Sequence, residues 1–271
     1  MAELIVKSHK PDKQGKSLEI TPEQAGWDHV GFEVFALKKG EELEKNTEDR
    51  EVCLVLLSGR ADVATNHQSF ENIGERMDVF EWIPPYSVYL PPKERYHIQA
   101  RTDLEVAVCS APSNGNYEPR LISPYDVGKE KRGTDHLTRH IHNILPEDKP
   151  ADSLLVVEVL TPQGSWSGFP PHKHDEENLP YESKLEETYY HKIQPESGFA
   201  FQRVYTDDRS LDENMIVNHN DAVMVPKGYH PVAAPPGHNV YFLNVMAGPE
   251  RVWKFQTDPE HEWLLDHYKV Y

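Results

Sequence analysis

Hydrophobic residues along the chain fall into short runs of 6–10 residues, among them GFEVFAL, VCLVLLSG, SLLVVEVL, GFAFQRVY, DAVMVP and NVYFLNVMAG. The runs are rich in Val, Phe, Tyr and Leu, and 22 prolines and 15 glycines punctuate the sequence. Short β-prone runs with turn residues between them predict an all-β protein, a sandwich or a barrel. A helical pattern is expected only in TDPEHEWLLDHYKVY, at the C-terminus, as one short helix.

The pattern repeats about halfway along the chain. Three segments recur in the same order at offsets of about 124 to 137 residues: SVYLPPKERYHIQA with AVMVPKGYHPVAA, EVAVCSAP with FLNVMAGP, and GFEVFALKKG with VVEVLTPQG. Glu51 with the run VCLVLL likewise matches Glu187 with TYYHKI. Such ordered self-similarity indicates two domains of one fold. We predict an N-terminal barrel at 1–120, a linker at 121–145, a C-terminal barrel at 146–250 and a tail with the helix at 251–271.

The second half of the repeat carries an insertion that holds two histidines. Ten residues lie between Gly40 and Glu51, but 22 lie between Gly164 and Glu187. The longer segment contains His172 and His174, whereas its counterpart EELEKNTEDR has no histidine. We therefore expect a metal site in the C-terminal barrel and none in the N-terminal one, although Glu51 and His97 are present there.

His172 and His174 have the spacing of a ligand pair. On an extended segment, residues i and i+2 point to the same side, and two imidazoles can bind one ion at ~2.0–2.2 Å. Glu187 begins the next β-prone run, and His230 follows another in the turn PKGYH. Three histidines and one glutamate leave coordination positions open, as in catalytic metal sites. The predicted ligands are His172, His174, Glu187 and His230.

The choice of glutamate lies between two neighbours. Adjacent strand residues face opposite sides, so only one of Glu186 and Glu187 can reach the ion. The repeat aligns Glu187 with Glu51 and Glu186 with Arg50. An arginine is tolerable on an outer face and costly inside a barrel. This alignment favours Glu187, and Glu186 remains the alternative.

Three further side chains are candidates for catalysis. Tyr189 and His191 share a strand face with Glu187, so either is a candidate proton carrier. Arg203 alternates with Phe201 and Tyr205, and we predict that it binds a substrate carboxylate through its planar fork. A salt bridge from Arg203 to Asp207 or Asp208 is the alternative. The insertion at 175–186 is either a lid or an ordered edge of the barrel.

A second histidine pair occurs in HLTRHIHNILP, at His140 and His142. No strand led by a carboxylate follows it at a similar distance, so we expect a packing role.

The formal net charge of −17 disfavours nucleic acid and anionic lipid as partners. The chain has no transmembrane-length apolar run and no signal-peptide pattern, and its two cysteines lie in apolar runs. These features favour a cytoplasmic protein with reduced thiols.

The order of these motifs resembles the two-part cupin signature: HxH, a glutamate that leads a strand, then Pro-x-Gly-x-His. Together with the repeat, it resembles a bicupin with one metal site. The strings PPHKHDEEN, LEETYYH, GFAFQRVYTDDRSLDE, VPKGYHPV and YFLNVMAGPERVW are similar to the 5-deoxy-glucuronate isomerase family of bacterial myo-inositol catabolism, which is itself similar to 5-keto-4-deoxyuronate isomerase.

This resemblance implies an aldose–ketose isomerase that converts 5-deoxy-D-glucuronate into 5-dehydro-2-deoxy-D-gluconate through an enediolate. It implies one divalent transition metal, for which imidazole and carboxylate ligands suit Zn, Mn, Fe and Ni alike. An Fe(II)-dependent bicupin dioxygenase and a sugar-binding bicupin without turnover are the alternatives. The expected partner is a small sugar acid, and a homo-oligomer is possible because cupin sheet edges commonly pair.

Overall fold

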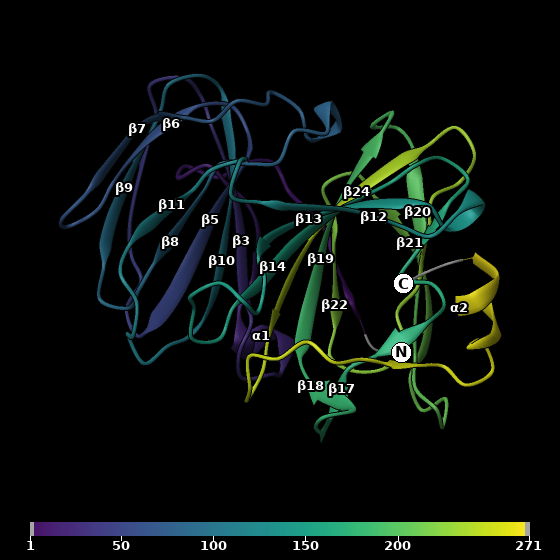
Figure 1. The fold of residues 1–271 in the computed structure, drawn as a ribbon. Helices are drawn as coiled ribbons and strands as arrows, with labels where there is room; N and C mark the ends of the chain where they lie inside the picture. Colours follow the sequence, from purple (N-terminus) through teal and green to yellow (C-terminus); the bar gives the residue numbers. More distant parts are fainter. Residues whose placement is uncertain (1–2, 269–271) are drawn as a thin grey trace. The chain divides into compact units, whose positions relative to one another are not determined.

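The computed structural model describes residues 3–268, and nearly all of its regular structure is β-strand (Figure 1). The chain divides into two compact units. The N-terminal barrel comprises residues 8–128 and 143–156, and the C-terminal barrel comprises 3–7, 129–142 and 157–268 of the described chain. Two β units of similar size agree with the internal repeat, although their boundaries differ from those expected.

The N-terminal barrel consists of two antiparallel sheets. The larger sheet has the order β11 (Arg120–Ile122), β8 (Ser87–Leu90), β5 (Arg50–Ser58), β10 (Leu104–Pro112), β3 (Gly31–Leu37) and β2 (Lys16–Ile20). The smaller sheet has the order β4 (Glu42–Asn46), β9 (Arg95–Ala100), β6 (Ala61–Ala64) and β7 (Ser69–Ile73). A short helix, α1 (Pro22–Ala25), has the capping box that Thr21 and Gln24 form, and a 3-10 turn spans Val79–Glu81.

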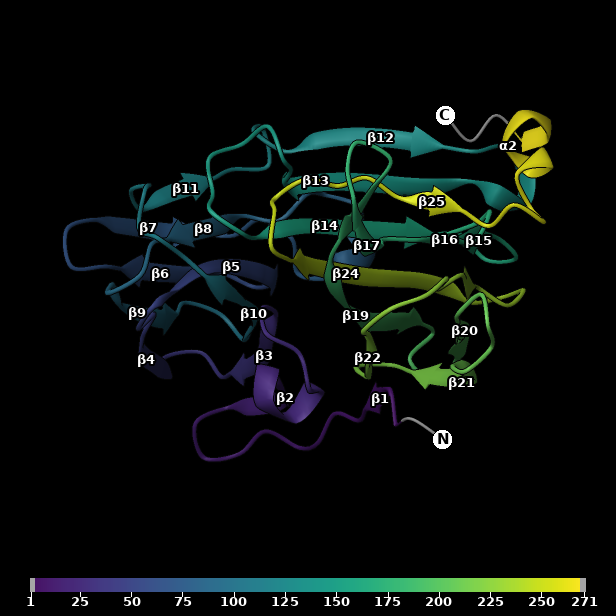
Figure 2. The same cartoon turned by 90° about the horizontal axis from the view of Figure 1, so that it is seen from below.

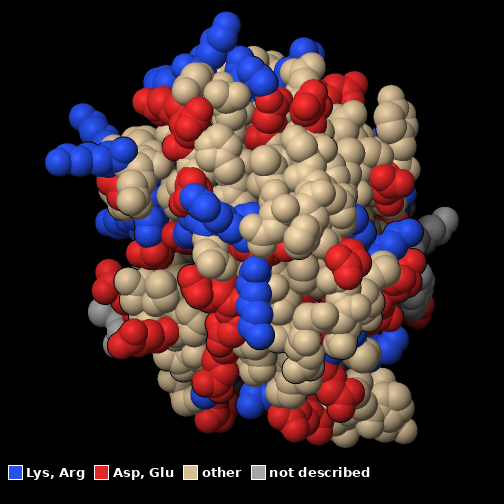
Figure 3. Space-filling view, turned by 90° about the vertical axis from the view of Figure 1, so that its left-hand side faces the viewer, with Lys and Arg blue, Asp and Glu red and all other residues tan. Residues whose placement is uncertain are grey.

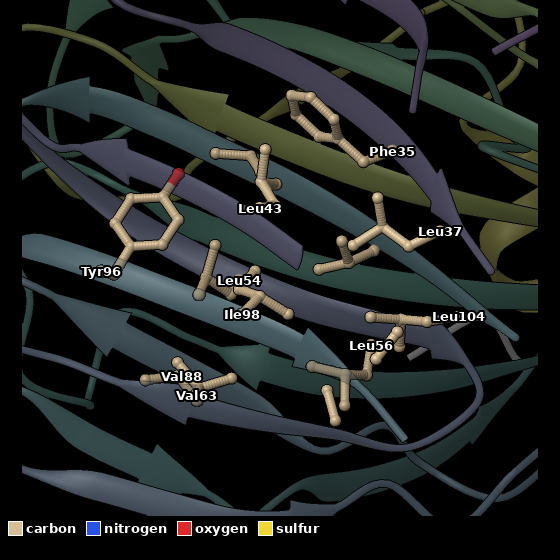
Figure 4. Close-up of a cluster of buried hydrophobic side chains, with 14 of the residues drawn as sticks. Phe35, Leu37, Leu43, Leu54, Leu56, Val63, Val88, Tyr96, Ile98 and Leu104 are labelled. Atoms are coloured by element: carbon tan, nitrogen blue, oxygen red, sulfur yellow. The ribbon is translucent and has the colours of Figure 1, made fainter. Parts of the chain in front are cut away.

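Aliphatic side chains fill the interior of the N-terminal barrel. Val52, Leu54 and Leu56 alternate along β5 and belong to one buried cluster with Tyr96 and Ile98 of β9. Figure 4 shows Leu54 and Leu56 beside Tyr96 and Ile98. The period of two therefore sends even-numbered residues of β5 into the core. Consequently Glu51 and Cys53 lie on the opposite face of this strand.

This orientation corrects the alignment of the two repeats. Val52 pairs with Leu90, and Glu187 pairs with Val225. Leu90 and Val225 occupy equivalent places in VYLP and VMVP. The counterpart of Glu187 is therefore Val52, and the expected pairing of Glu187 with Glu51 is off by one residue. By the same count, Leu54 and Leu56 stand where the C-terminal barrel has Tyr189 and His191.

Glu51 instead anchors a segment of its own unit. Its carboxylate is fully buried and accepts hydrogen bonds from the Tyr89 hydroxyl (2.6 Å) and from the backbone N–H groups of Asp152 (2.8 Å), Ser153 (2.6 Å) and Leu154 (2.6 Å). Several donors on one carboxylate satisfy its charge without a cation. His97, on the outer face of β9, pairs with Glu42.

Replacing Glu51 with glutamine is expected to lower the free energy of unfolding by about 3 kcal/mol, because an amide cannot accept from this many donors and leaves some buried and unpaired. Chemical denaturation measures this loss, and metal content should stay near wild type. The control is Glu42→Gln, an exposed partner of His97, which should cost no more than about 0.5 kcal/mol. Coincident unfolding midpoints for the two variants would contradict the anchoring role.

The C-terminal barrel has a seven-stranded sheet in the order β1 (Ile5–Val6), β22 (Ala222–Val225), β19 (Glu186–Gln194), β24 (Asn239–Ala247), β14 (Leu155–Thr161), β13 (Arg139–Leu145) and β12 (Gly128–Arg132). A four-stranded sheet follows the order β15 (Trp166–Ser167), β23 (Val232–Ala233), β20 (Phe199–Tyr205) and β21 (Asp212–Asn218). Two further pairs are β16 (His172–Lys173) with β25 (Gln256–Thr257), and β17 (Asp175–Asn178) with β18 (Glu182–Lys184).

Two segments expected elsewhere belong to this larger sheet. Residues 121–145, expected as a linker, contain β12 and β13, which run beside β14 and β24 in Figure 2. Ile5 and Val6, expected in the N-terminal barrel, pair with β22, and this pairing covers an exposed strand edge. The composition of β12 did not indicate a strand because β12 forms the edge of this sheet, and edge strands carry charged residues.

The expected C-terminal helix is present as α2 (Trp263–Tyr268). The same unit also contains a 3-10 turn at Asp135–Leu137. Neither helix within residues 3–268 is long and apolar enough to cross a membrane. Both cysteines are buried and free, as expected.

On the face drawn in Figure 3, acidic and basic side chains lie interspersed, so this face presents no continuous basic surface for a phosphate backbone.

Candidate metal site and catalytic cavity

Strand β19 carries the carboxylate of the site. It lies between β22 and β24, where Glu187 pairs with Val225 on one side and Met246 on the other. The Glu187 side chain is 2% exposed and points at the histidines, whereas Glu186 is only partly buried. The structure therefore places Glu187, and not Glu186, on the inner face of the strand.

His172 and His174 flank a lysine that faces the other way. The short strand β16 pairs His172 with Thr257 of β25, and the alternation of extended backbone turns both imidazoles to one side. Between them, the Lys173 ammonium lies 2.9 Å from Asp175 and 3.4 Å from Glu182. These ion pairs tie β16 to the β17–β18 hairpin, so the insertion at 175–186 forms an ordered hairpin at the barrel edge.

His230 is placed by a turn that requires glycine. Gly228 has a φ of 90°, and a Cβ atom there would lie 2.4 Å from the Tyr205 carbonyl oxygen. Its N–H donates to the Asp175 carboxylate at 2.7 Å. The backbone of Tyr229 then forms an isolated antiparallel β-bridge with that of Tyr205. The next residue, His230, turns inward and is completely buried.

The three imidazoles and the carboxylate converge. One ring nitrogen from each of His172, His174 and His230 lies within 4.8 Å of the other two. Glu187 Oε2 lies 3.0 Å from His174 Nε2 and 3.2 Å from His230 Nε2. All four predicted ligands therefore come together in the described structure.

The hydrogen bonds of the rings show that this donor set fits a metal ion. His174 Nδ1 lies 3.2 Å from the Leu185 carbonyl oxygen, and His230 Nδ1 lies 2.8 Å from that of Gly228. Because a carbonyl only accepts, each Nδ1 carries the hydrogen, and in a neutral ring Nε2 then presents a lone pair. Buried His230 Nε2 has no hydrogen-bond partner. Two lone pairs facing a carboxylate repel it unless a positive charge lies between them, and a divalent metal ion would supply that charge.

Electrostatic interactions within the cluster follow this geometry. Burial alone favours neutral Glu187, but the His174 and His230 rings outweigh it and hold the pKa of this carboxyl well below its usual range. Burial opposes the charged form of His174, but the Glu187 carboxylate raises the pKa of this ring. Burial and the neighbouring His230 and His174 rings lower the pKa of His172. The cluster thus favours an ionised carboxylate beside at least one neutral imidazole.

Asn244 holds the carboxylate in place. Its amide group donates to Glu187 Oε1 from the neighbouring strand β24, which leaves Oε2 directed at the imidazoles. Asn244 is 4% exposed and sits in the apolar run NVYFLNVMAG. A polar residue in the middle of such a run was the signal that sequence reasoning missed.

The cluster opens onto a cavity of about 450 Å³. Its polar lining consists of Glu130, Arg132, Arg139, Ser167, His172, Glu187, Tyr189, Asn244 and Thr257, and its apolar lining includes Ile141, Val157, Val159, Phe169, Phe242, Trp253, Phe255 and Leu265. A concave, largely apolar site with a few converging polar groups is typical of a small-molecule site. The two arginines of the wall were not predicted from the sequence.

Tyr189 and His191 differ in their access to the cavity. Tyr189 lines it beside Glu187, and burial together with the Glu187 charge raises the pKa of this phenol. His191 is not part of the lining; its ring stacks behind Tyr189 with centroids 6.0 Å apart. Burial lowers the pKa of His191 to about 3, and its Nε2 has no hydrogen-bond partner. Of the two predicted proton carriers, the structure brings Tyr189 to the cavity.

Arg203 lies elsewhere. Its guanidinium forms two hydrogen bonds of 2.7 Å with Asp212 on the neighbouring strand β21, and it lines a different cavity. On β20, Ala200, Gln202 and Val204 are buried, whereas Phe201 is 48% exposed. Arg203 therefore lies on the same outer face of β20 as Phe201. This placement does not fit the expected role at a substrate carboxylate. The salt-bridge alternative holds, with Asp212 in place of Asp207 or Asp208.

The second histidine pair is not assembled as a metal site. His142 Nδ1 lies 2.6 Å from the Glu158 carboxylate, which also accepts from the Tyr241 hydroxyl at 2.9 Å. His140, two residues earlier, is partly exposed and lies outside the histidine group described above. This arrangement agrees with the expected packing role.

Comparisons with known proteins identify the family. The family model described as "KduI/IolB family" matches residues 4–264. The 5-deoxy-glucuronate isomerase of Geobacillus thermodenitrificans is 62% identical over 98% of this chain and 97% of that protein. The protein of the same name from Bacillus subtilis strain 168 is 49% identical over 92% of each.

Solved structures support the same assignment. An IolB-like protein from Salmonella typhimurium LT2 matches with a TM-score of 0.95 and 51% identity, over 97% of this chain and 99% of that one. A Lactobacillus farciminis oxalate decarboxylase matches with a TM-score of 0.68 and 14% identity, over 100% and 95%, which shows the fold alone. These matches confirm the expected all-β bicupin fold. The chain belongs to the KduI/IolB family.

Proposed function

We propose that this chain is a metal-dependent isomerase that converts 5-deoxy-D-glucuronate into 5-dehydro-2-deoxy-D-gluconate in myo-inositol catabolism. The observation that carries the proposal is the 62% identity, over nearly the whole chain, to a protein named 5-deoxy-glucuronate isomerase. The convergence of His172, His174, His230 and Glu187 at the wall of a small-molecule cavity supports it independently.

The reaction moves one hydrogen between adjacent carbons. A base removes the proton from C2 of the aldose, and the resulting enediolate is reprotonated at C1. One proton also passes from the C2 hydroxyl to the former carbonyl oxygen, so the product is an isomeric ketose. A divalent metal ion, when bound by the four ligands, would polarise the carbonyl and stabilise the negative oxygen.

The protein supplies positioning and proton transfer. Tyr189 lines the cavity beside Glu187, so its hydroxyl is the best-placed group to carry a proton to or from the sugar oxygens. Asn244 orients Glu187. The apolar wall formed by Val157, Phe242 and Phe255 limits access of water to the reactive enediolate.

The ligand atoms of the site are those that bind a divalent transition metal. Three imidazoles and one carboxylate suit Zn, Mn, Fe and Ni alike, since metals of this series share these ligands and differ mainly in geometry and availability. Bacillus subtilis oxalate decarboxylase, whose solved structure shares the fold at 14% identity, has Mn(II) centres. We propose one such ion in the C-terminal barrel and none in the N-terminal one.

The proposal is tested by incubating the purified protein with 5-deoxy-D-glucuronate under argon and identifying the product by NMR. The expected result is the ketose, formed at the same rate as in air. Product that forms only with dioxygen would instead favour a bicupin dioxygenase. Binding of the uronate without any turnover by metal-loaded protein would favour a sugar-binding module.

A further inference from the structure

Arg139 carries a buried positive charge in the wall of the cavity. It opens strand β13 and is 7% exposed. Within residues 3–268, its one side-chain hydrogen bond runs from Nη1 to the Leu137 carbonyl oxygen at 3.0 Å. A neutral carbonyl satisfies one of five guanidinium donors and does not balance the charge.

Such a charge is costly unless an anion pairs with it. Buried arginines are normally matched by carboxylates, because desolvation of an unpaired guanidinium costs several kcal/mol, on the order estimated for single buried ions. Arg139 has no carboxylate partner in the described chain, yet its side chain lines a cavity large enough for a small molecule. An anion that enters this cavity would complete the pair.

Arg132, on the same wall, is already paired. Its guanidinium lies 2.9 Å from the Glu130 carboxylate, and its side chain is 30% exposed. The Arg132–Glu130 pair is therefore close to neutral and partly solvated. Arg139 is the residue of this wall whose charge remains uncompensated and shielded from water.

The position of Arg139 suits a ligand that spans the cavity. His172 and Glu187 line the same cavity from the metal side. Arg139 lines that cavity too, so its positive charge and the metal side face one enclosed space. A uronate has a carbonyl at one end and a carboxylate at the other, and the cavity offers a group for each.

We propose that Arg139 binds the carboxylate of the sugar acid through its planar fork and selects uronates over neutral aldoses. The proposal rests on the proposed function, which supplies the uronate. With the carboxylate held by Arg139, the aldehyde end of the sugar lies toward His172, His174, His230 and Glu187. Arg139 is thus a substrate-binding residue, and Arg203 has no part in this contact.

The test compares two substrates with wild type and Arg139→Gln, using metal-loaded protein and NMR detection of product. One substrate is 5-deoxy-D-glucuronate; the other is 5-deoxy-D-xylo-hexose, in which a hydroxymethyl group replaces the carboxylate. For the uronate, kcat/KM should fall about thirtyfold, mainly through KM, the scale of lost charge-assisted hydrogen bonds. For the neutral aldose, kcat/KM should change by less than about threefold.

The ratio of the two kcat/KM values does not depend on how much variant folds, because misfolded protein lowers both values equally. Arg139→Lys keeps the charge without the fork and should give an intermediate ratio. The control Arg209→Gln removes an exposed arginine outside the cavity and should keep the wild-type ratio. A wild-type ratio in Arg139→Gln, whether both substrates lose activity equally or neither does, would contradict the role of Arg139 alone. A metal-loaded wild type that leaves the uronate unconverted would overturn both proposals.

Discussion

Replacing His230 with alanine is expected to release most of the bound metal and abolish isomerase activity. The ring is completely buried and its Nε2 lies 3.2 Å from Glu187 Oε2, so alanine at this position leaves a gap among the converging ligand atoms. His172→Ala and His174→Ala should behave alike, since each removes one of three converging nitrogens. Metal content by elemental analysis and activity by NMR are the measurements.

The control for loss of a histidine is His97→Ala. His97 is 37% exposed and pairs with Glu42 on the N-terminal barrel, so this variant should keep its metal. Far-UV circular dichroism should match wild type in all four variants, because the substitutions leave the sheets intact. Stoichiometric metal retained by the three cavity variants would refute the assigned ligand set.

Glu187→Gln should lower metal affinity by at least about tenfold and turnover by about a hundredfold, the scale seen when a ligand's environment is perturbed. The substitution removes the negative charge that faces His174 and His230 and keeps the shape of the side chain. Glu186→Gln, one residue away on the outer face, should change stability by no more than about 0.5 kcal/mol and retain its metal. Metal titration of the two proteins measures the difference.

A reversed order of affinities would show that the inner face of β19 begins at Glu186. Thr188 and Tyr190 would then face the cavity in place of Tyr189 and His191, since strand neighbours alternate. Tyr189 would lose its proposed role in proton transfer. The pair of variants therefore tests the register of the strand as well as the identity of the ligand.

The fold and the ligand set could be predicted because they follow from local patterns. Short β-prone runs and their repetition indicated two β units, and the i, i+2 spacing of His172 and His174 needs only an extended backbone. The structure places Glu187 on the inner face of its strand, as predicted. However, the alignment of Glu187 with Glu51, on which that prediction was based, is off by one residue. Glu51 faces away from its own core, and Val52 occupies the equivalent position.

The misplacement of Arg203 has a physical cause. A period of two assigns residues to two faces but does not say which face is inner. Aromatic neighbours made the Arg203 face resemble the inner one, yet small and polar side chains such as Ala200 and Gln202 fill the interior, and Phe201 is 48% exposed. Arg139 was missed because it lies in a segment of charged, turn-rich composition, and its burial depends on contacts distant in sequence.

If metal held by this site drives the isomerisation, activity must follow metal content in a titration of stripped protein. The protein is stripped with a chelator, checked by elemental analysis, and titrated with one divalent metal at a time while conversion of 5-deoxy-D-glucuronate is followed by NMR. We expect no ketose from the stripped protein and activity that rises to a plateau at one equivalent of metal. Full turnover by metal-free protein, or a plateau only at two equivalents, would contradict it.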